Sequence, residues 1–166
     1  MRRVIIDCDP GQDDAVALLL ALASEDELDL AGITCVADNV PLRHTVRNAL
    51  RVRELSGRRA VPVYAGCPAP ILRPLATAEE VHGKTGLDGV DLPEPDHGAE
   101  ERHAVEFIIE SCRAAPDDGI TLCPIGPMTN IAMALVMVPE IRRSIREIAF
   151  MGGVALDPGN ITPSAE

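Results

Sequence analysis

Aromatic residues are almost missing from this sequence. Its 166 residues contain no Trp, one Tyr and two Phe. The hydrophobic core must therefore be aliphatic, built from Val, Ile, Leu, Ala and Met. Stacking of nucleobases on aromatic rings is also excluded as a major binding device in this part of the chain.

Positive charge is scarce as well. Lys and Arg total 15 against 26 Asp and Glu, which gives a net charge of −11. A strongly acidic chain repels phosphate backbones, which argues against nucleic acid as a partner. No apolar run is long enough to span a bilayer, and the chain begins directly with a strand pattern. We therefore expect a cytoplasmic protein without a membrane partner.

The cysteines show no zinc-binding or disulfide pattern. The count is odd, and no pair has the CxxC spacing. Both features indicate a reducing compartment, again the cytoplasm. The five are Cys8, Cys35, Cys67, Cys112 and Cys123.

Strand and helix patterns alternate along the chain. The apolar patterns predict strands at residues 4–8, 28–37, 61–65, 120–124 and 145–151. Helices are predicted at residues 13–23, 41–56, 101–114 and 127–138, with a long loop at 66–99 and a loop-like tail after 152. This alternation predicts one α/β domain over residues 1–166, an open, mostly parallel Rossmann-like sheet with helices on both faces. Ligands in such sheets bind beyond the carboxyl ends of the strands.

Four aspartates fall within eight residues at the end of the first predicted strand: Asp7, Asp9, Asp13 and Asp14. Packing four carboxylates together is unfavourable unless a cation offsets the repulsion, and Ca²⁺ binds six to eight such oxygens. Helix capping is the simpler alternative, because aspartate is common where helices begin. Capping explains one or two of the four but not Asp7 and Asp9 at the strand end, so we favour a metal or substrate site.

The segment 7–15, DCDPGQDDA, resembles the signature of the inosine-uridine preferring nucleoside hydrolase family. Further segments resemble motifs of that family in the same order along essentially the whole chain. They are ADN at 37–39, HGKTGL at 82–87, PIGPMTN at 124–130, MGG at 151–153 and GNITPSAE at 159–166.

The resemblance implies a Ca²⁺ site and a ribose site. Ca²⁺ would be held by the carboxylates of Asp9 and Asp14 and by the backbone carbonyl of Ile125, a position where the family often has Thr. Asp9 would also be the general base for a calcium-bound water, with Asp7 supporting the site from behind. The residues expected to bind ribose hydroxyls are Asp13, Asn39, Asn160 and Glu166.

His82 is a second candidate for catalysis, because histidine titrates near neutrality and can donate a proton to a leaving base. An ordinary exposed loop histidine is an equally good reading of the sequence. Asn130 follows a turn and more plainly supports the loop than binds ligand. Cys8, between two site aspartates, should face the opposite side of the strand and belong to the core.

These residues together predict hydrolysis of the N-glycosidic bond of ribonucleosides to ribose and free base, a reaction of purine and pyrimidine salvage. One alternative is a phosphatase with Asp7 and Asp9 as an Asp-x-Asp pair, although that chemistry expects Thr or Val at Gly11 and a suitably placed lysine. Lys84, in a Gly-rich loop, is the only lysine. The other alternative is an inactive calcium-binding or sugar-binding fragment.

The family resemblance also raises expectations about assembly. It suggests a homo-oligomer, a dimer or tetramer, and a further calcium-binding Asp next to a His far downstream, which no residue here matches. We therefore expect the chain to be C-terminally incomplete relative to the family and inactive alone, and either poorly soluble or dependent on a second polypeptide. The sequence does not indicate whether purine or pyrimidine nucleosides are preferred.

Overall fold

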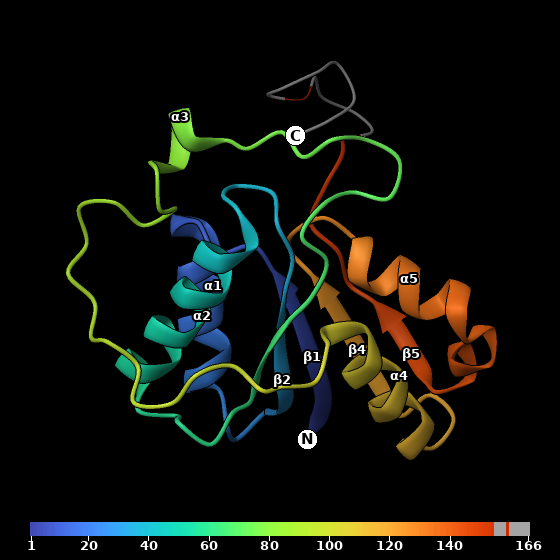
Figure 1. Cartoon of the computed structure of the whole chain (residues 1–166). Helices are drawn as coiled ribbons and strands as arrows, with labels where there is room; N and C mark the ends of the chain where they lie inside the picture. Colours follow the sequence, from blue (N-terminus) through green and yellow to red (C-terminus); the bar gives the residue numbers. More distant parts are fainter. Residues whose placement is uncertain (155–158, 160–166) are drawn as a thin grey trace.

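The computed structural model describes residues 1–154 and 159 and shows a single parallel sheet with helices on both faces (Figure 1). The strands are β1 (Arg2–Cys8), β2 (Leu28–Cys35), β3 (Val63–Ala65), β4 (Ile120–Pro124) and β5 (Ile145–Ile148). The helices are α1 (Gln12–Ala23), α2 (Leu42–Ser56), α3 (Glu79–His82), α4 (Ala104–Ala114), α5 (Thr129–Met137) and the 3₁₀ helix η1 (Pro139–Arg143).

The strand order is β3-β2-β1-β4-β5, and every strand pairing in the described chain is parallel. β1 lies at the centre, so its residues 4–8 are buried, as a continuous apolar run in a parallel sheet requires. Asp7 is paired in register with Thr34 of β2 on one side and Pro124 of β4 on the other. The carboxyl ends of these three strands therefore meet at one edge of the sheet, and the expected fold class is confirmed.

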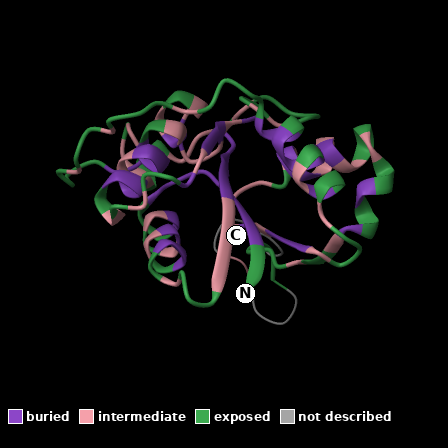
Figure 2. Cartoon of the chain, turned by 90° about the horizontal axis from the view of Figure 1, so that it is seen from below, coloured by how far each residue is buried: buried purple, intermediate pink, exposed green. Residues whose placement is uncertain are grey.

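Two hydrophobic cores flank the sheet, one on each face (Figure 2). Leu18 and Leu22, four residues apart on α1, are almost fully buried in the core that α1 and α2 share with one face. Ile108 of α4 and Ile131 of α5 are fully buried in the core of the other face. Aliphatic side chains dominate both cores, as the composition predicts.

Two of the few aromatic rings lie together in the second core. Tyr64 and Phe107 stack with their ring centroids 3.9 Å apart and an interplanar angle of 15°. Gly32 of β2 makes room for them, since a Cβ at this position would lie 2.7 Å from the Phe107 ring. Tyr64 and Phe107 therefore pack between the sheet and α4, whereas the third aromatic residue, Phe150, is exposed.

The segment between β3 and α4 lies along α2 and is fastened to it by polar contacts. The guanidinium of Arg51 donates to the Leu92 carbonyl at 2.5 Å, and that of Arg53 donates to the His97 carbonyl at 2.9 Å. The sequence predicts only a loop at 66–99, whereas residues 79–82 form the short helix α3. Its first turn is fixed by a bond from the Ala78 amide to the Asn39 carbonyl, and it ends at Gly83, whose φ is 80°.

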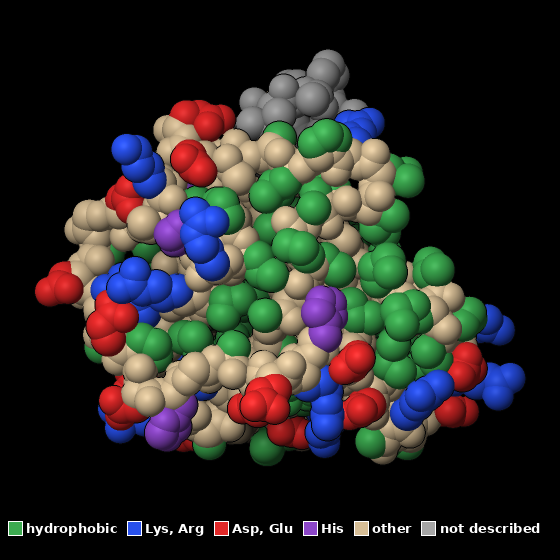
Figure 3. All heavy atoms as spheres, viewed as in Figure 1, with side chains coloured by type: hydrophobic (Ala, Val, Ile, Leu, Met, Phe, Trp, Pro, Cys, Tyr) green, Lys and Arg blue, Asp and Glu red, His purple; other side chains and the backbone are tan. Residues whose placement is uncertain are grey.

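Other boundaries also differ from the sequence expectation. α4 begins at Ala104 rather than 101, because the His103 ring accepts a bond from the Val105 amide and caps the helix. The predicted strand 145–151 ends at Ile148, and the 3₁₀ turn η1 was not expected. In the described part of the chain, no helix has the length and hydrophobicity needed to cross a membrane. Figure 3 shows hydrophobic side chains across the middle of one face, with charged side chains mainly toward its rim.

Candidate active site

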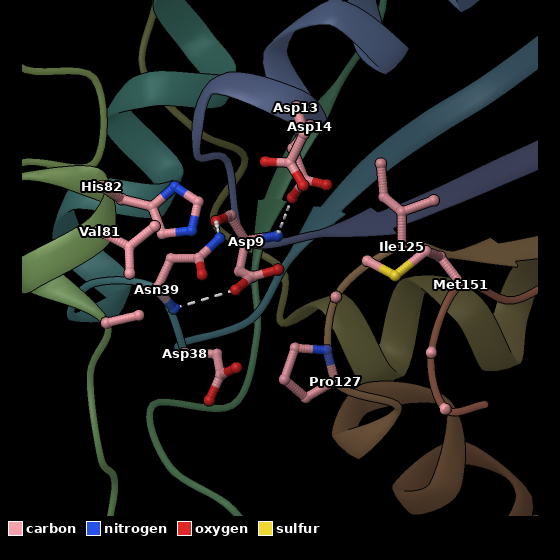
Figure 4. A pocket seen from close by; sticks show the side chains of 14 residues that line it. Asp9, Asp13, Asp14, Asp38, Asn39, Val81, His82, Ile125, Pro127 and Met151 are labelled. Atoms are coloured by element: carbon pink, nitrogen blue, oxygen red, sulfur yellow. Dashed lines mark hydrogen bonds between the residues drawn. The ribbon is translucent and has the colours of Figure 1, made fainter. Parts of the chain in front are cut away.

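A cavity of about 490 Å³ opens at the carboxyl ends of β1, β2 and β4 (Figure 4). Its walls come from the loops after these strands, from the first turn of α1, from α3 and from the segment after β5. The lining residues include four aspartates and a histidine. They are Asp9, Asp13, Asp14, Asp38, Asn39, Ala78, Val81, His82, Ile125, Gly126, Pro127, Met151, Gly152 and Gly153.

Asp9 and Asp14 form the centre of the site. Both are almost fully buried, at 4% and 3% exposure. The backbone N–H of Asp9 donates to the Asp14 carboxylate at 2.8 Å, which ties the first turn of α1 to the end of β1. Asp9 Oδ2 accepts a bond from the Asn39 N–H at 3.0 Å. Both carboxylates are therefore held by backbone groups and lie at the cavity wall, as Figure 4 shows.

Gly126 allows the loop after β4 to approach Asp9. A Cβ at residue 126 would lie 2.2 Å from Asp9 Oδ1, which is too close for any residue with a side chain. Ile125 is fixed beside it, because its N–H donates to the Asp7 carbonyl at 2.8 Å. The glycine in the PIGP turn is thus explained by the close approach of backbone and carboxylate.

Burial and mutual repulsion act on these acids. Burial, and then the charge of Asp14, raise the pKa of Asp9 well above the usual carboxyl value. Burial also raises the pKa of Asp14, although its bond from the Asp9 amide lowers it in part. Ionisation of both neighbouring carboxyls is therefore unfavourable unless a cation compensates their charge. Their electrostatics therefore fit a bound divalent ion.

The donor set defines which ion would fit. Asp9 and Asp14 offer carboxylate oxygens, and Ile125 has a backbone carbonyl in the same cavity wall. Oxygen-only donors suit a hard cation such as Ca²⁺ or Mg²⁺. Within residues 1–154 and 159, however, no group of three or more His, Cys, Asp or Glu side chains could hold a metal ion. The described residues supply two carboxylates toward such a site.

Asp7 lies behind the cavity and is fully buried. Its Oδ1 accepts bonds from the Thr34 hydroxyl and from Asn130 Nδ2, the latter at 2.8 Å. Burial raises the pKa of Asp7 to about 7, although the bonds from Asn130 and Thr34 lower it. Asp7 is not among the residues that line the cavity, so its position fits the expected supporting role.

Asn130, at the start of α5, joins three strand ends. Its Nδ2 donates to Asp7 Oδ1 and, at 3.0 Å, to the Cys35 carbonyl at the end of β2. Its Oδ1 accepts from the Cys67 N–H beyond β3 at 2.8 Å. The side chain is fully buried. Asn130 thus holds the loops that surround the cavity without lining it.

Asn130→Ala should strongly destabilise the protein. The substitution removes the side-chain partner of the part-buried Cys67 amide and of the buried Cys35 carbonyl, and each such loss costs about 1–3 kcal/mol. We expect the free energy of unfolding, measured by urea titration, to fall by about 2–5 kcal/mol. Thr129→Ala, at the neighbouring half-buried position, is the matched control. A loss below about 1 kcal/mol would show that the three bonds contribute little.

Two of the predicted ribose-binding residues lie at the cavity. Asn39 is half-buried, and its Nδ2 donates to the Asp9 carbonyl at 3.0 Å. Asp13 is exposed at the start of α1 and faces the same cavity. The other two predictions, Asn160 and Glu166, lie outside the described residues. The structure therefore brings Asp13 and Asn39 together with Asp9 and Asp14.

His82 lies at the end of α3 rather than in the loop predicted at 66–99, and it lines the cavity. Its Nδ1 is 2.7 Å from Gln12 Oε1, a contact between residues 70 positions apart. Gly11 makes this approach possible, because a Cβ there would lie 2.4 Å from His82 Nδ1. Nothing in the sequence pairs Gln12 with His82, so this contact was not predicted.

Three other residues of the cavity wall were not predicted from the sequence. Asp38, Pro127 and Met151 all line the cavity, although no role was predicted for them from the sequence. Asp38 could have been found, because it follows a predicted strand and precedes Asn39. Cys8 matches its expected core position, since it is fully buried in the core that includes α1.

The sheet and the carboxylate-lined cavity at its carboxyl edge define an α/β protein with a small-molecule site. Residues 4–166 match the family described as inosine-uridine preferring nucleoside hydrolase. The chain belongs to this family, as its motifs indicate.

Relatives with known names support the match. The chain is 49% identical over 165 residues to the pyrimidine-specific ribonucleoside hydrolase RihB of Escherichia coli, covering 99% of this chain and 51% of the relative. An uncharacterized protein of Schizosaccharomyces pombe is 50% identical over 164 residues, again covering 99% of this chain and 53% of the relative. The chain thus spans about half the length of these relatives.

Solved structures agree with the fold. A purine-preferring ribonucleoside hydrolase from Gardnerella vaginalis superposes with a TM-score of 0.91 at 37% identity, covering 98% of this chain and 52% of that one. A plant nucleoside hydrolase gives a TM-score of 0.90 at 34% identity, covering 99% and 52%.

Proposed function

We propose that this chain carries the calcium and ribose part of a ribonucleoside hydrolase site and takes part in hydrolysis of the N-glycosidic bond. The observation that carries the proposal is the buried pair Asp9 and Asp14 at the wall of a 490 Å³ cavity. That volume falls within the range of about 300–1,000 Å³ that small-molecule sites occupy. Membership of the nucleoside hydrolase family supports it.

Ca²⁺ is the proposed ion, held by Asp9, Asp14 and the carbonyl of Ile125. Such an ion would lower the pKa of a nearby water and hold vicinal ribose hydroxyls. Asp9 is the proposed general base, because it is buried, lines the cavity and is oriented by the Asn39 amide. Its carboxylate takes the proton of the attacking water.

The other residues position the sugar and stabilise the charge that develops on it. Asp13 and Asn39 are proposed to bind ribose hydroxyls, together with Asn160 and Glu166. The carboxylates around the cavity offset positive charge at the anomeric carbon, as in glycosidases. His82 is proposed to protonate the leaving base, with its ring oriented by the contact to Gln12.

The cavity wall argues against the phosphatase alternative. Among the described residues that line it, there is no Lys or Arg to bind a phosphate. Four aspartates face the same space and would repel one. A neutral nucleoside suits these surroundings better than a phosphorylated substrate.

The proposal is tested on the full-length protein by a panel of inosine, uridine, adenosine and cytidine, with and without a calcium chelator. We expect release of free ribose from at least one nucleoside, and its loss when calcium is removed. The named relatives include a pyrimidine-specific and a purine-preferring enzyme, so the panel also determines the base preference. Calcium-independent release of phosphate from sugar phosphates, with no ribose from any nucleoside, would contradict the proposal.

A further inference from the structure

Of the four aspartates that line the cavity, Asp38 is the one that is not proposed to bind metal or ribose. It follows β2 and lines the cavity, and its side chain is half-buried. Figure 4 shows Asp13 and Asp14 on one side of Asp9 and Asp38 on the other. The two sides are therefore separate ends of one cavity.

The backbone around Asp38 is firmly held. The Ala37 N–H donates to the Cys67 carbonyl at 3.1 Å, and the Asn39 N–H donates to Asp9 Oδ2 at 3.0 Å. The Asn39 carbonyl accepts from the Ala78 N–H at 3.0 Å. Residues on both sides of Asp38 are thus fixed to three other segments. The carboxylate of Asp38 is presented from a rigid position, which is what selective binding requires.

The Asp38 side chain has no partner in the described part of the chain. No hydrogen bond or ion pair joins it to residues 1–154 or 159 in the structure, whereas the side-chain amide of its neighbour Asn39 donates to the Asp9 carbonyl. A half-buried carboxylate without a donor has lost part of its hydration and gained nothing in exchange. A donor group on a bound ligand would supply the missing bond.

The position of Asp38 limits which part of a nucleoside it could meet. With Asp13 and Asn39 proposed to bind ribose hydroxyls, and Asp9 and Asp14 proposed to bind the ion, Asp38 meets another part of the molecule. The polar groups that remain are the 5′-hydroxyl and the edge of the base. Both can donate a hydrogen bond to a carboxylate.

We propose that Asp38 contacts the substrate and selects nucleosides that present a hydrogen-bond donor, either the 5′-hydroxyl or an exocyclic amine of the base. This role rests on the proposed function. It makes Asp38 a specificity-determining residue rather than part of the metal site. A ligand that lacks the donor should bind without benefit from Asp38.

The test is calorimetric titration of the full-length protein, in saturating calcium, with C-nucleosides, whose carbon–carbon bond to the base cannot be hydrolysed. Formycin A carries an exocyclic amine, formycin B carries an oxo group, and 5′-deoxy forms of both lack the 5′-hydroxyl. Asp38→Ala should weaken binding of the donor-bearing ligand by about tenfold or more, as expected for a hydrogen bond to a charged group. The ligand without that donor should lose about twofold or less.

The pattern of loss identifies the donor. Sensitivity that disappears in the 5′-deoxy compounds assigns the 5′-hydroxyl, and sensitivity that disappears in formycin B assigns the amine. Asp117→Ala, an exposed aspartate between α4 and β4, is the control and should change nothing. The calcium-induced rise in Tm should also be unchanged in Asp38→Ala.

Three results would overturn the role of Asp38. One is equal weakening of all four ligands, another is no weakening of any, and a third is loss of the calcium response in Asp38→Ala. A wild-type chain that binds calcium but none of the four ligands would contradict the proposed function itself, and with it this role. Wild-type binding with uniform weakening would contradict the role of Asp38 alone.

Discussion

In the full-length enzyme, Asp9→Asn is expected to lower kcat by about 10³-fold or more. General base catalysis contributes about 10²–10⁴ by itself, and the amide also removes a proposed calcium ligand. The substitution preserves shape, and Asn Oδ1 can still accept the bond from the Asn39 amide. The loss should therefore reflect chemistry rather than misfolding.

A stability measurement distinguishes loss of catalytic chemistry from misfolding of the Asp9→Asn protein. Burial and the charge of Asp14 raise the pKa of Asp9, so its ionised form is unfavourable in the folded protein without a cation. In chelator at neutral pH, Asp9→Asn should then be at least as stable as the wild type. Asp117→Asn is the matched control and should leave both kcat and stability unchanged. A stable Asp9→Asn protein with near wild-type turnover would disprove the role of Asp9 as base.

Asp14→Ala is expected to abolish calcium-dependent stabilisation. A ligand that binds only the folded state at 100 times its Kd raises the free energy of unfolding by about 2.7 kcal/mol. Asp14 supplies one of the two buried carboxylates in the proposed site, and without it Ca²⁺ loses a principal ligand. Chemical unfolding at increasing calcium concentration measures the effect, with Asp117→Ala as the control.

Both the stability of the protein in chelator and its stabilisation by calcium should depend on pH. Carboxyls with raised pKa values in the folded state bind protons that the unfolded state has released. In chelator, stability should therefore fall as pH rises from about 4, the ordinary carboxyl pKa, through the raised value of about 7 for Asp7. Calcium requires ionised ligands, so its stabilising effect should grow over that range. A calcium effect that weakens with rising pH, or persists in Asp14→Ala, would place the ion elsewhere.

The fold was largely predictable because its signals are local. Five strand patterns alternate with helix patterns, and this alternation requires a parallel sheet. Strand ends were less predictable, because pairing partners decide where a strand stops. The predicted strand 145–151 ends at Ile148, where the regular pairing with β4 stops. The short helix α3 depends on Asn39, a residue far away in the sequence.

In the site, too, local sequence signals were predictable and contacts between distant segments were not. Asp9, Asp14, Asp13 and Asn39 were predicted, and they do meet at one cavity. Contacts between distant segments were not predictable. The approach of His82 to Gln12 depends on where α3 lies, and the position of Asp38 depends on how the loop after β2 is held. Asn130 was predicted as a supporting residue, but its three partners were not.

The central position of β1 has a consequence for synthesis on the ribosome. β1, β2 and β3 lie within the first 65 residues and can pair as soon as they emerge, while β4 follows only at Ile120. Asp7 and its partner Asn130 are 123 residues apart. At ordinary elongation rates of about 5–20 residues per second, one edge of β1 stays open for several seconds. During that interval the nascent chain exposes an unpaired strand and a carboxyl without its amide partner, the stage at which chaperones would protect it from aggregation.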